Sequence, residues 1–159
     1  QVLFDWCARH LLGLGYLIVV RPHPAHCRKA EKWLLEQDER VRQQIQINAP
    51  EESLAENLIH LHPVCVLSSV TGAMVEVALG GWPLGVVLSN WLPDYAPLTA
   101  MSDSEIFSSQ DAAEVTAWIE RLWGDTGYRT AYSQKCRDAA EMHITAISQQ
   151  AAQALAEVL

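Results

Sequence analysis

The sequence lacks several features that mark large classes of protein function. It has no run rich in lysine and arginine, and its 159 residues carry a formal net charge of −8, so it offers no basic surface for a nucleic acid. No apolar run approaches the roughly 18 to 20 residues that a membrane span needs. The N-terminus does not read as a signal peptide, because Asp5, Arg9 and His10 interrupt its apolar residues. We therefore expect a protein of the cytoplasm, either free or peripheral to the membrane.

Paired cysteines are also missing. The four cysteines are Cys7, Cys27, Cys65 and Cys136, and none of them belongs to a Cys-x-x-Cys pair. This pattern is typical of small buried thiols in a reducing compartment. Only Cys27, close in sequence to His23 and His26, has neighbours that a catalytic cysteine would need, and we favour a structural role for it as well.

Standard nucleotide and metal motifs are absent too. The chain has no GxGxxG, GxxxxGK[ST] or GxSxG sequence, which argues against a standard dinucleotide, P-loop or α/β-hydrolase site. His60 and His62 form a His-x-His pair, but no nearby carboxylate or cysteine completes a ligand set. We expect no metal.

Half of the residues are hydrophobic, which is enough for the core of a single domain over residues 1–159. Short apolar runs at residues 16–20, 45–50, 64–69, 83–89 and 106–109 alternate with segments of helical periodicity. The expected helices cover residues 1–15, 24–42, 50–63, 70–81 and 108–125, and a long C-terminal helix starts at Thr130. This alternation predicts the α/β class, with a doubly wound, three-layer Rossmann-like parallel sheet.

In such sheets, ligands bind beyond the carboxyl ends of the strands, and polar residues follow three of the expected strands. After the first clear strand come Arg21, His23, Pro24 and His26. After the second come Ser68, Ser69, Thr71 and Gly72. After the third come Ser89, Asn90, Asp94 and Tyr95. We expect these three groups to converge at one edge of the sheet.

The second group has the chemistry of a phosphate site. A helix starts within a few residues of the strand end, so its free backbone N–H groups and the hydroxyls of Ser68, Ser69 and Thr71 can bind an anion. Gly72 permits close approach of a ligand, and Glu76, about one turn into the helix, could accept hydrogen bonds from a ribose diol. The alternative is that Ser69 or Thr71 is only a helix N-cap.

His23 is the second candidate for phosphate binding. Its imidazole can donate to a phosphate oxygen, and Pro22 and Pro24 stiffen the turn that holds it. The alternative is a structural histidine at a strand end. A second His-Pro pair, His62-Pro63, precedes its strand and should lie at the opposite edge of the sheet, so we interpret it as structural.

The segments "VVRPHP", "CVLSSVTGAMVEVALGGWPLGVV" and "LPDYAPL" together resemble part of a known enzyme family. The similarity covers about residues 15 to 100. It is to the C-terminal, donor-binding half of GT-B glycosyltransferases in the group of sialyltransferase-like enzymes, capsule polysaccharide transferases and CDP-glycerol glycerophosphotransferases. The matching positions are His23-Pro24, Ser68-Ser69, Glu76 and Trp82-Pro83.

The resemblance implies a function in surface or capsular polysaccharide synthesis. His23, Arg21 and the serines would hold the phosphate of a cytidine-activated donor, a CMP- or CDP-linked sugar or CDP-glycerol, and no other cofactor is implied. The reaction would be displacement at an anomeric carbon or at a glycerol-linked phosphorus, with a saccharide acceptor. His23 would stabilise the leaving nucleoside phosphate or give it a proton.

The resemblance also implies a second domain. In these enzymes the active site lies between two Rossmann-like domains, and in the sialyltransferase-like members the N-terminal domain supplies the general base. The present chain starts at Gln1 inside an expected helix. We therefore expect either a fragment of a larger enzyme, which the start inside a helix favours, or a stand-alone half. A fragment alone should bind a nucleotide weakly and catalyse nothing.

Two other interpretations stay open. UDP-N-acetylglucosamine 2-epimerases share the GT-B architecture, but they typically show "DSGG" where this chain has "LSSVTG". A non-enzymatic α/β module could instead use the same strand ends to bind a small anion or a protein.

Overall fold

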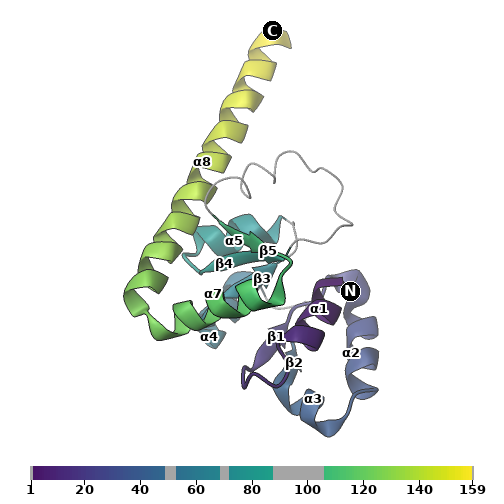
Figure 1. Cartoon of the computed structure of the whole chain (residues 1–159). Helices are drawn as coiled ribbons and strands as arrows, with labels where there is room; N and C mark the ends of the chain where they lie inside the picture. Colours follow the sequence, from purple (N-terminus) through teal and green to yellow (C-terminus); the bar gives the residue numbers. More distant parts are fainter. Residues whose placement is uncertain (1, 49–52, 69–71, 88–105, 159) are drawn as a thin grey trace. The chain divides into compact units, whose positions relative to one another are not determined.

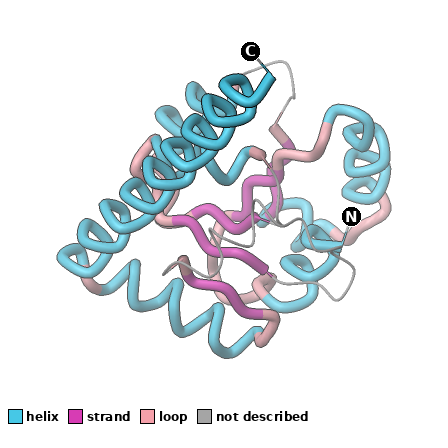
Figure 2. Tube along the Cα trace, turned by 90° about the horizontal axis from the view of Figure 1, so that it is seen from above, coloured by secondary structure: helices cyan, strands magenta, loops and turns pink. Residues whose placement is uncertain are grey.

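The computed structural model describes residues 2–48, 53–68, 72–87 and 106–158. The chain divides into two compact units, Gln1–Leu61 and His62–Leu159, and each is described here by itself. Each unit combines helices with a small parallel sheet (Figure 2). The α/β class expected from the sequence is therefore confirmed, whereas the described strands pair as two separate sheets and not as one doubly wound sheet.

The first unit contains two strands and a set of short helices. In chain order its elements are α1 (Val2–His10), β1 (Ile18–Val20), the 3-10 turn η1 (Pro24–His26), α2 (Cys27–Leu35), α3 (Glu39–Gln44), β2 (Ile45–Ile47) and α4 (Leu54–Leu61). Strands β1 and β2 are parallel, and Val20 is opposite Ile47 in the last pair of the register. Both expected strands of this unit are thus confirmed.

The start of the first unit follows its apolar spacing closely. Cys7 and Leu11 recur four residues apart on one face of the helical segment, and both are buried. The turn after α1 is made by Gly13 and Gly15, which both have φ values in the left-handed region that glycine adopts most readily. Burial also raises the pKa of the Cys7 thiol to about 12, because an apolar environment disfavours the thiolate.

The single helix expected over residues 24–42 is wrong. The structure has a 3-10 turn followed by two α-helices, α2 and α3, which are separated at residues 36–38. The reason is Asp38, whose carboxylate accepts a hydrogen bond from the backbone N–H of Val41 at 2.9 Å and so caps a new helix. An aspartate at an N-cap satisfies a backbone donor that a continuous helix would not leave free.

Helix α4 begins with a capping box. Ser53 Oγ accepts a hydrogen bond from the backbone N–H of Glu56 at 3.1 Å, and the Glu56 carboxylate accepts from the backbone N–H of Ser53 at 3.3 Å. The Ser53 hydroxyl also donates to this carboxylate at 2.8 Å, and these hydrogen bonds hold the pKa of Glu56 below its usual value. The arrangement fixes where α4 starts.

The second unit is built around a three-stranded parallel sheet. Its elements are β3 (Val66–Ser68), α5 (Ala73–Leu79), β4 (Leu84–Val87), β5 (Phe107–Ser109), α7 (Ala112–Gly124) and α8 (Thr126–Val158). The strand order is β3-β4-β5, and every residue of the central strand β4 is buried, as expected for a strand covered on both faces. Helix α8 packs against α5 and α7 (Figure 1).

An aromatic cluster from α7 packs directly on the sheet of the second unit. The indole of Trp118 stacks on the ring of Phe107 with 4.8 Å between ring centroids, and it meets Tyr132 edge-on. Gly85 of β4 lies underneath, where an added Cβ would stand only 2.8 Å from Trp118 Cη2. The absent side chain at residue 85 thus makes room for the indole.

The hydroxyl of Tyr132 connects α8 with two strands. It donates a hydrogen bond to the carbonyl oxygen of Leu84 at 2.8 Å and accepts one from the backbone N–H of Phe107 at 2.6 Å. Burial is the main cause that raises the pKa of this phenol and that of the neighbouring Cys136 thiol. One buried group therefore satisfies backbone atoms at the starts of both β4 and β5.

The last two helices are capped by aspartates. Asp111 caps α7 by accepting hydrogen bonds from the backbone N–H groups of Ala113 and Glu114. The long helix was expected to start at Thr130 but starts at Thr126, because the Asp125 carboxylate accepts from the backbone N–H of Tyr128 at 2.8 Å. Within the described ranges, no helix has the length and apolarity that crossing a membrane requires.

Candidate functional site

The carboxyl end of β1 leads directly into the Arg-Pro-His-Pro sequence. Arg21 is the first residue after the strand, and His23 occupies the N-cap position of η1. His23 Nδ1 accepts a hydrogen bond from the backbone N–H of Ala25 at 3.2 Å. This bond assigns the proton of the neutral ring to Nε2, so the exposed side of the imidazole presents a hydrogen-bond donor.

The turn around His23 is held by its own backbone. The carbonyl oxygen of His23 accepts a hydrogen bond from the N–H of His26 at 2.7 Å and one from the Cys27 thiol at 3.5 Å. The Cys27 thiol thus donates to a carbonyl oxygen, and this bond activates no nucleophile. The geometry supports the structural role that we favoured for Cys27.

Asn48 is a polar residue at the same sheet edge that the sequence analysis missed. It directly follows β2, and its backbone N–H donates to the carbonyl oxygen of Val20 at 2.9 Å, which extends the ladder one step beyond β2. Asn48 and Arg21 are therefore the first residues after two paired strands. The signal was present in "IQIN", where an amide side chain follows a short apolar run.

In the second unit, the expected phosphate site is described in part. Ser68 is the last residue of β3, Gly72 stands at the N-cap position of α5, and Glu76 is exposed on that helix. A Cβ added at Gly72 would meet no other group within 4 Å, so there is open space around this residue. Several predicted site residues lie outside the described ranges, namely Ser69, Thr71, Ser89, Asn90, Asp94 and Tyr95.

The predicted residues thus fall into two groups, one in each unit. Arg21, His23 and Asn48 share the carboxyl edge of the β1–β2 sheet, and the backbone of Pro24 belongs to η1 beside them. Ser68 and Glu76 belong to the β3–α5 segment of the second unit. The approach of the two groups to one ligand stays a prediction.

The second His-Pro pair precedes its strand, as the sequence predicts, but that strand belongs to a different sheet from the strand of the first pair. His62 and Pro63 connect α4 to β3, so they precede the amino end of that strand. His62 has a φ of 43°, and its ring centroid lies 6.1 Å from that of Trp82. The two His-Pro pairs therefore occupy opposite ends of their strands.

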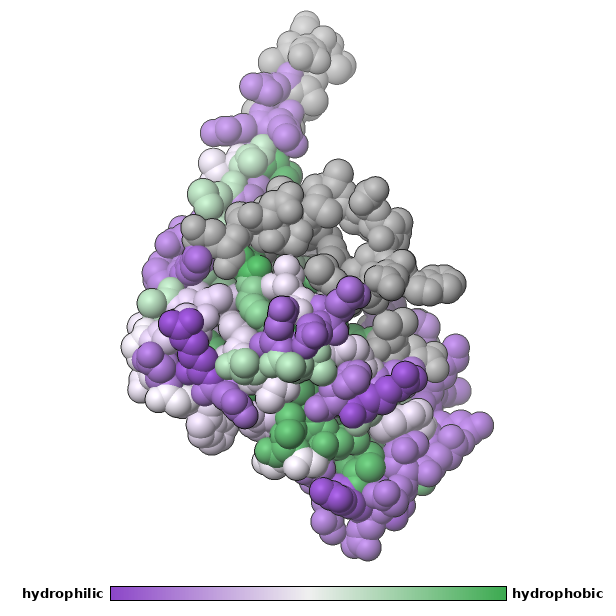
Figure 3. All heavy atoms as spheres, viewed as in Figure 1, coloured by the Kyte–Doolittle hydropathy of each residue, from purple (hydrophilic) through white to green (hydrophobic). Residues whose placement is uncertain are grey.

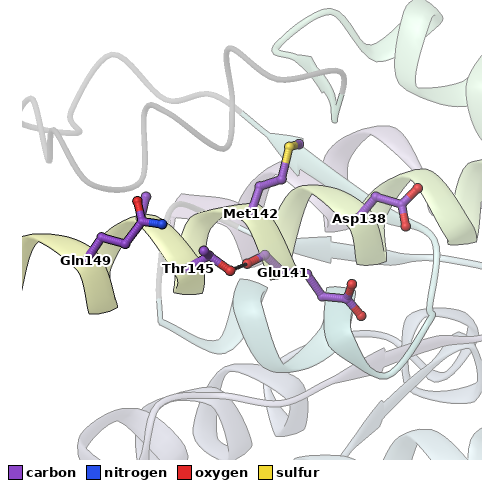
Figure 4. Close-up of a pocket in the computed structure, with 6 residues that line it drawn as sticks. Asp138, Glu141, Met142, Thr145 and Gln149 are labelled. Atoms are coloured by element: carbon purple, nitrogen blue, oxygen red, sulfur yellow. Dashed lines mark hydrogen bonds between the residues drawn. The ribbon is translucent and has the colours of Figure 1, made fainter.

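A shallow pocket of about 460 Å³ lies along α8 (Figure 4). It is lined by Asp138, Glu141, Met142, Thr145, Ala146 and Gln149. All six residues come from one helix, and the hydroxyl of Thr145 is already used in a hydrogen bond to the Glu141 carbonyl at 2.9 Å. The pocket includes none of the residues that follow the strands, so we do not assign the site to it.

The charges near the first unit's helices are mixed in sign. Hydrophilic side chains gather over α2 and α3 (Figure 3). They include basic side chains (arginine and lysine) and acidic ones (glutamate and aspartate). Among the residues that the structure describes, no cluster of three or more histidine, cysteine or acidic side chains is arranged to hold a metal ion.

Comparison of the chain with protein-family models, with curated proteins and with solved structures found no match. What points to a function in this chain is therefore its own motifs and the polar residues at its strand ends.

Proposed function

We propose that this chain is the donor-nucleotide-binding half of a glycosyltransferase or glycerophosphotransferase that uses a CMP- or CDP-activated donor. The support comes from where the motifs lie on the observed elements. His23-Pro24 follows β1, Ser68 ends β3, Glu76 is exposed on α5, and Trp82-Pro83 directly precedes β4. This is the order of motifs and elements that the GT-B resemblance implies, and the finer assignment to a Rossmann-like GT-B half-domain is part of the proposal.

The observation that carries the proposal is the hydrogen bond between Ala25 N–H and His23 Nδ1. It holds the ring of an exposed histidine with Nε2–H as its free donor, at the carboxyl end of a parallel strand where α/β folds bind ligands. A fixed N–H donor next to the guanidinium-bearing Arg21 suits a phosphate oxygen. Because charge develops on the nucleoside phosphate as it leaves, donors held in place stabilise the transition state.

This geometry favours one of the two roles considered for His23. An imidazolium carries a proton on both ring nitrogens and so would lose the hydrogen bond from Ala25 N–H. The neutral ring keeps this bond and acts as a hydrogen-bond donor to the phosphate. We therefore propose stabilisation by Nε2–H rather than full proton transfer.

The first test is calorimetric titration of the chain with CMP, CDP and UDP. The proposal expects binding of CMP or CDP that is tighter than binding of UDP. A preference for UDP would instead favour the epimerase-like interpretation. Failure to bind any of the three nucleotides would refute the proposal and leave the non-enzymatic module.

Substitutions at residue 23 then separate ligand binding from turn formation. His23→Asn keeps a side-chain acceptor for Ala25 N–H, since asparagine is a good N-cap, but it removes the Nε2–H donor. We expect it to weaken CMP binding by about 10- to 100-fold, the range for losing a hydrogen bond to a charged group. His26→Ala is the matched control in the same turn, and equal effects of the two substitutions would contradict the assignment.

A further inference from the structure

Asn57 is a buried amide whose orientation is fixed by the backbone. It lies on α4 with 4% of its surface exposed. Its Nδ2 donates a hydrogen bond to the carbonyl oxygen of Ser53 at 3.1 Å, and a carbonyl oxygen can only accept. The Oδ1 atom of Asn57 is therefore the one that faces Asn48, and it accepts a hydrogen bond from Asn48 Nδ2.

The orientation of Asn57 determines that of Asn48. Because Asn48 Nδ2 donates to Asn57, the Asn48 Oδ1 atom lies on the other side of the amide, where it accepts from Gln46 Nε2 at 3.4 Å. Among the bonds between residues that the structure describes, one hydrogen on Asn48 Nδ2 and one lone pair on its Oδ1 are left over. Asn48 is partly exposed, so a ligand at this edge of the sheet can approach its amide.

Burying an amide side chain in a small unit costs more free energy than burying an apolar side chain. An asparagine side chain inside a protein costs free energy unless its polar atoms are paired, and an apolar residue of similar size would pack on α4 without that requirement. A buried hydrogen bond between two side chains allows only one arrangement of the groups that it connects. Here the connected group is the amide that follows β2.

The position of Asn48 places this amide beside the candidate phosphate-binding residues. The bond from its backbone N–H to Val20 makes it the neighbour of Arg21 across the strand pair, and His23 follows two residues later on the same strand end. The edge thus combines a cation, an imidazole N–H donor and a neutral amide. A nucleotide combines an anionic phosphate with an uncharged base that carries hydrogen-bond donors and acceptors.

We infer that Asn48 contacts the pyrimidine base of the donor nucleotide and that Asn57 is the positioning residue that fixes the Asn48 amide. This inference rests on the proposed function. The Watson–Crick edge of cytosine presents an amino donor next to a ring-nitrogen acceptor, which complements an amide that offers one acceptor and one donor. The guanidinium of Arg21 and the Nε2–H of His23 take the phosphate.

The experiment measures binding of CMP, ribose 5-phosphate and inorganic pyrophosphate to the full chain by calorimetry. Asn48→Ala should weaken CMP binding about tenfold and leave the other two ligands unchanged, because only CMP carries the base. Asn57→Leu should weaken CMP binding to a similar degree. The double variant should bind CMP no more weakly than Asn48→Ala alone, because the two residues act as one unit.

Ser53→Ala is the matched control for a merely structural effect. It removes the capping hydroxyl at the start of α4 but keeps the Ser53 carbonyl that orients Asn57. It should lower the thermal stability of the chain and leave CMP affinity unchanged. In NMR spectra of the unmodified chain, the side-chain amide signal of Asn48 should shift on adding CMP but not on adding pyrophosphate.

The outcomes separate this inference from the proposed function. If the unmodified chain binds none of the nucleotides, both the inference about Asn48 and the proposed function are wrong. If it binds CMP and Asn48→Ala binds CMP equally well, only the inference is wrong. Equal losses for CMP and ribose 5-phosphate would overturn the assignment to the base, and equal effects of Ser53→Ala and Asn57→Leu would overturn the positioning role. Asn48→Ala is a change at a half-exposed residue, so it decides the contact even if Asn57→Leu is too unstable to measure.

Discussion

Replacing Tyr132 by phenylalanine removes one buried hydroxyl and leaves the aromatic packing in place. The ring would still meet Trp118 edge-on, with 5.6 Å between their centroids. What is lost is the pair of hydrogen bonds that the hydroxyl makes with Leu84 and Phe107. The substitution therefore isolates the contribution of those two bonds to the stability of the second unit.

The expected loss of stability is the sum of the hydrogen bonds lost by two backbone groups, the Phe107 N–H and the Leu84 carbonyl. The N–H of Phe107 loses its acceptor at a part-buried position, which costs about 1–3 kcal/mol. The carbonyl of Leu84 loses the hydrogen bond from the Tyr132 hydroxyl, and an ordinary hydrogen bond contributes about 0.5–1.5 kcal/mol. We expect Tyr132→Phe to lower the free energy of unfolding by about 2–4 kcal/mol.

Urea unfolding followed by circular dichroism measures this difference. With a denaturant slope of about 2 kcal/mol per molar, the midpoint should fall by about 1–2 M. Tyr128→Phe is the control, because the Tyr128 ring, rather than its hydroxyl, makes the contact with Arg121 at 3.8 Å. A loss below about 0.5 kcal/mol for Tyr132→Phe, or equal losses for the two variants, would refute the role assigned to the hydroxyl.

Two further predictions concern the cores of the two units. Gly85→Ala should destabilise the second unit by about 1–3 kcal/mol and change the near-ultraviolet signal of Trp118, because its Cβ would stand 2.8 Å from the indole. Gly124→Ala, whose Cβ meets nothing within 4 Å, should be neutral or slightly stabilising, and the same result at both positions would contradict the packing argument. The Cys7 thiol has a pKa raised from 9.0 to about 12 in the folded chain, so its contribution to stability is present below pH 9 and is lost as the pH rises towards 12. Over that window Cys7→Ala should make the fall in stability with pH shallower, by up to about 1.4 kcal/mol per pH unit, and parallel curves for the two proteins would count against burial as the cause.

The sequence predicts the elements of this fold well where the pattern is local. The run "YLIVV" contains β1, "PLGVVLS" contains β4, and the glycines at residues 13 and 15 end the first helical segment in the left-handed turn that they favour. These signals depend on neighbouring residues alone, because burial selects continuous apolar runs and positive φ values select glycine.

Helix boundaries are less predictable because a single capping aspartate outweighs the periodicity around it. Asp38 divides a segment whose apolar spacing continues through it, and Asp125 starts α8 before a glycine that would ordinarily argue for a loop. In both cases one side-chain hydrogen bond to a free backbone N–H decides the boundary. Periodicity carries no information about such a bond.

The candidate site, too, has some features that local sequence predicts and others that it does not. The sequence places Arg21 and His23 after a strand, which the structure confirms, but the tautomer of His23 depends on a bond to Ala25 that only coordinates reveal. Asn48 is hard to predict because the strand before it is only three residues long, and the polar Gln46 interrupts its apolar run. The pairing of Asn48 with Asn57 spans nine residues and two elements, and no local pattern encodes it.

The hydroxyl that joins Leu84 to Phe107 has an evolutionary consequence. Because a residue of α8 bonds to backbone atoms of both β4 and β5, the spacing of these two strands is tied to helix α8 as well as to their own ladder. Selection should therefore retain tyrosine at residue 132 in homologues even where the exposed residues of α8 around it drift.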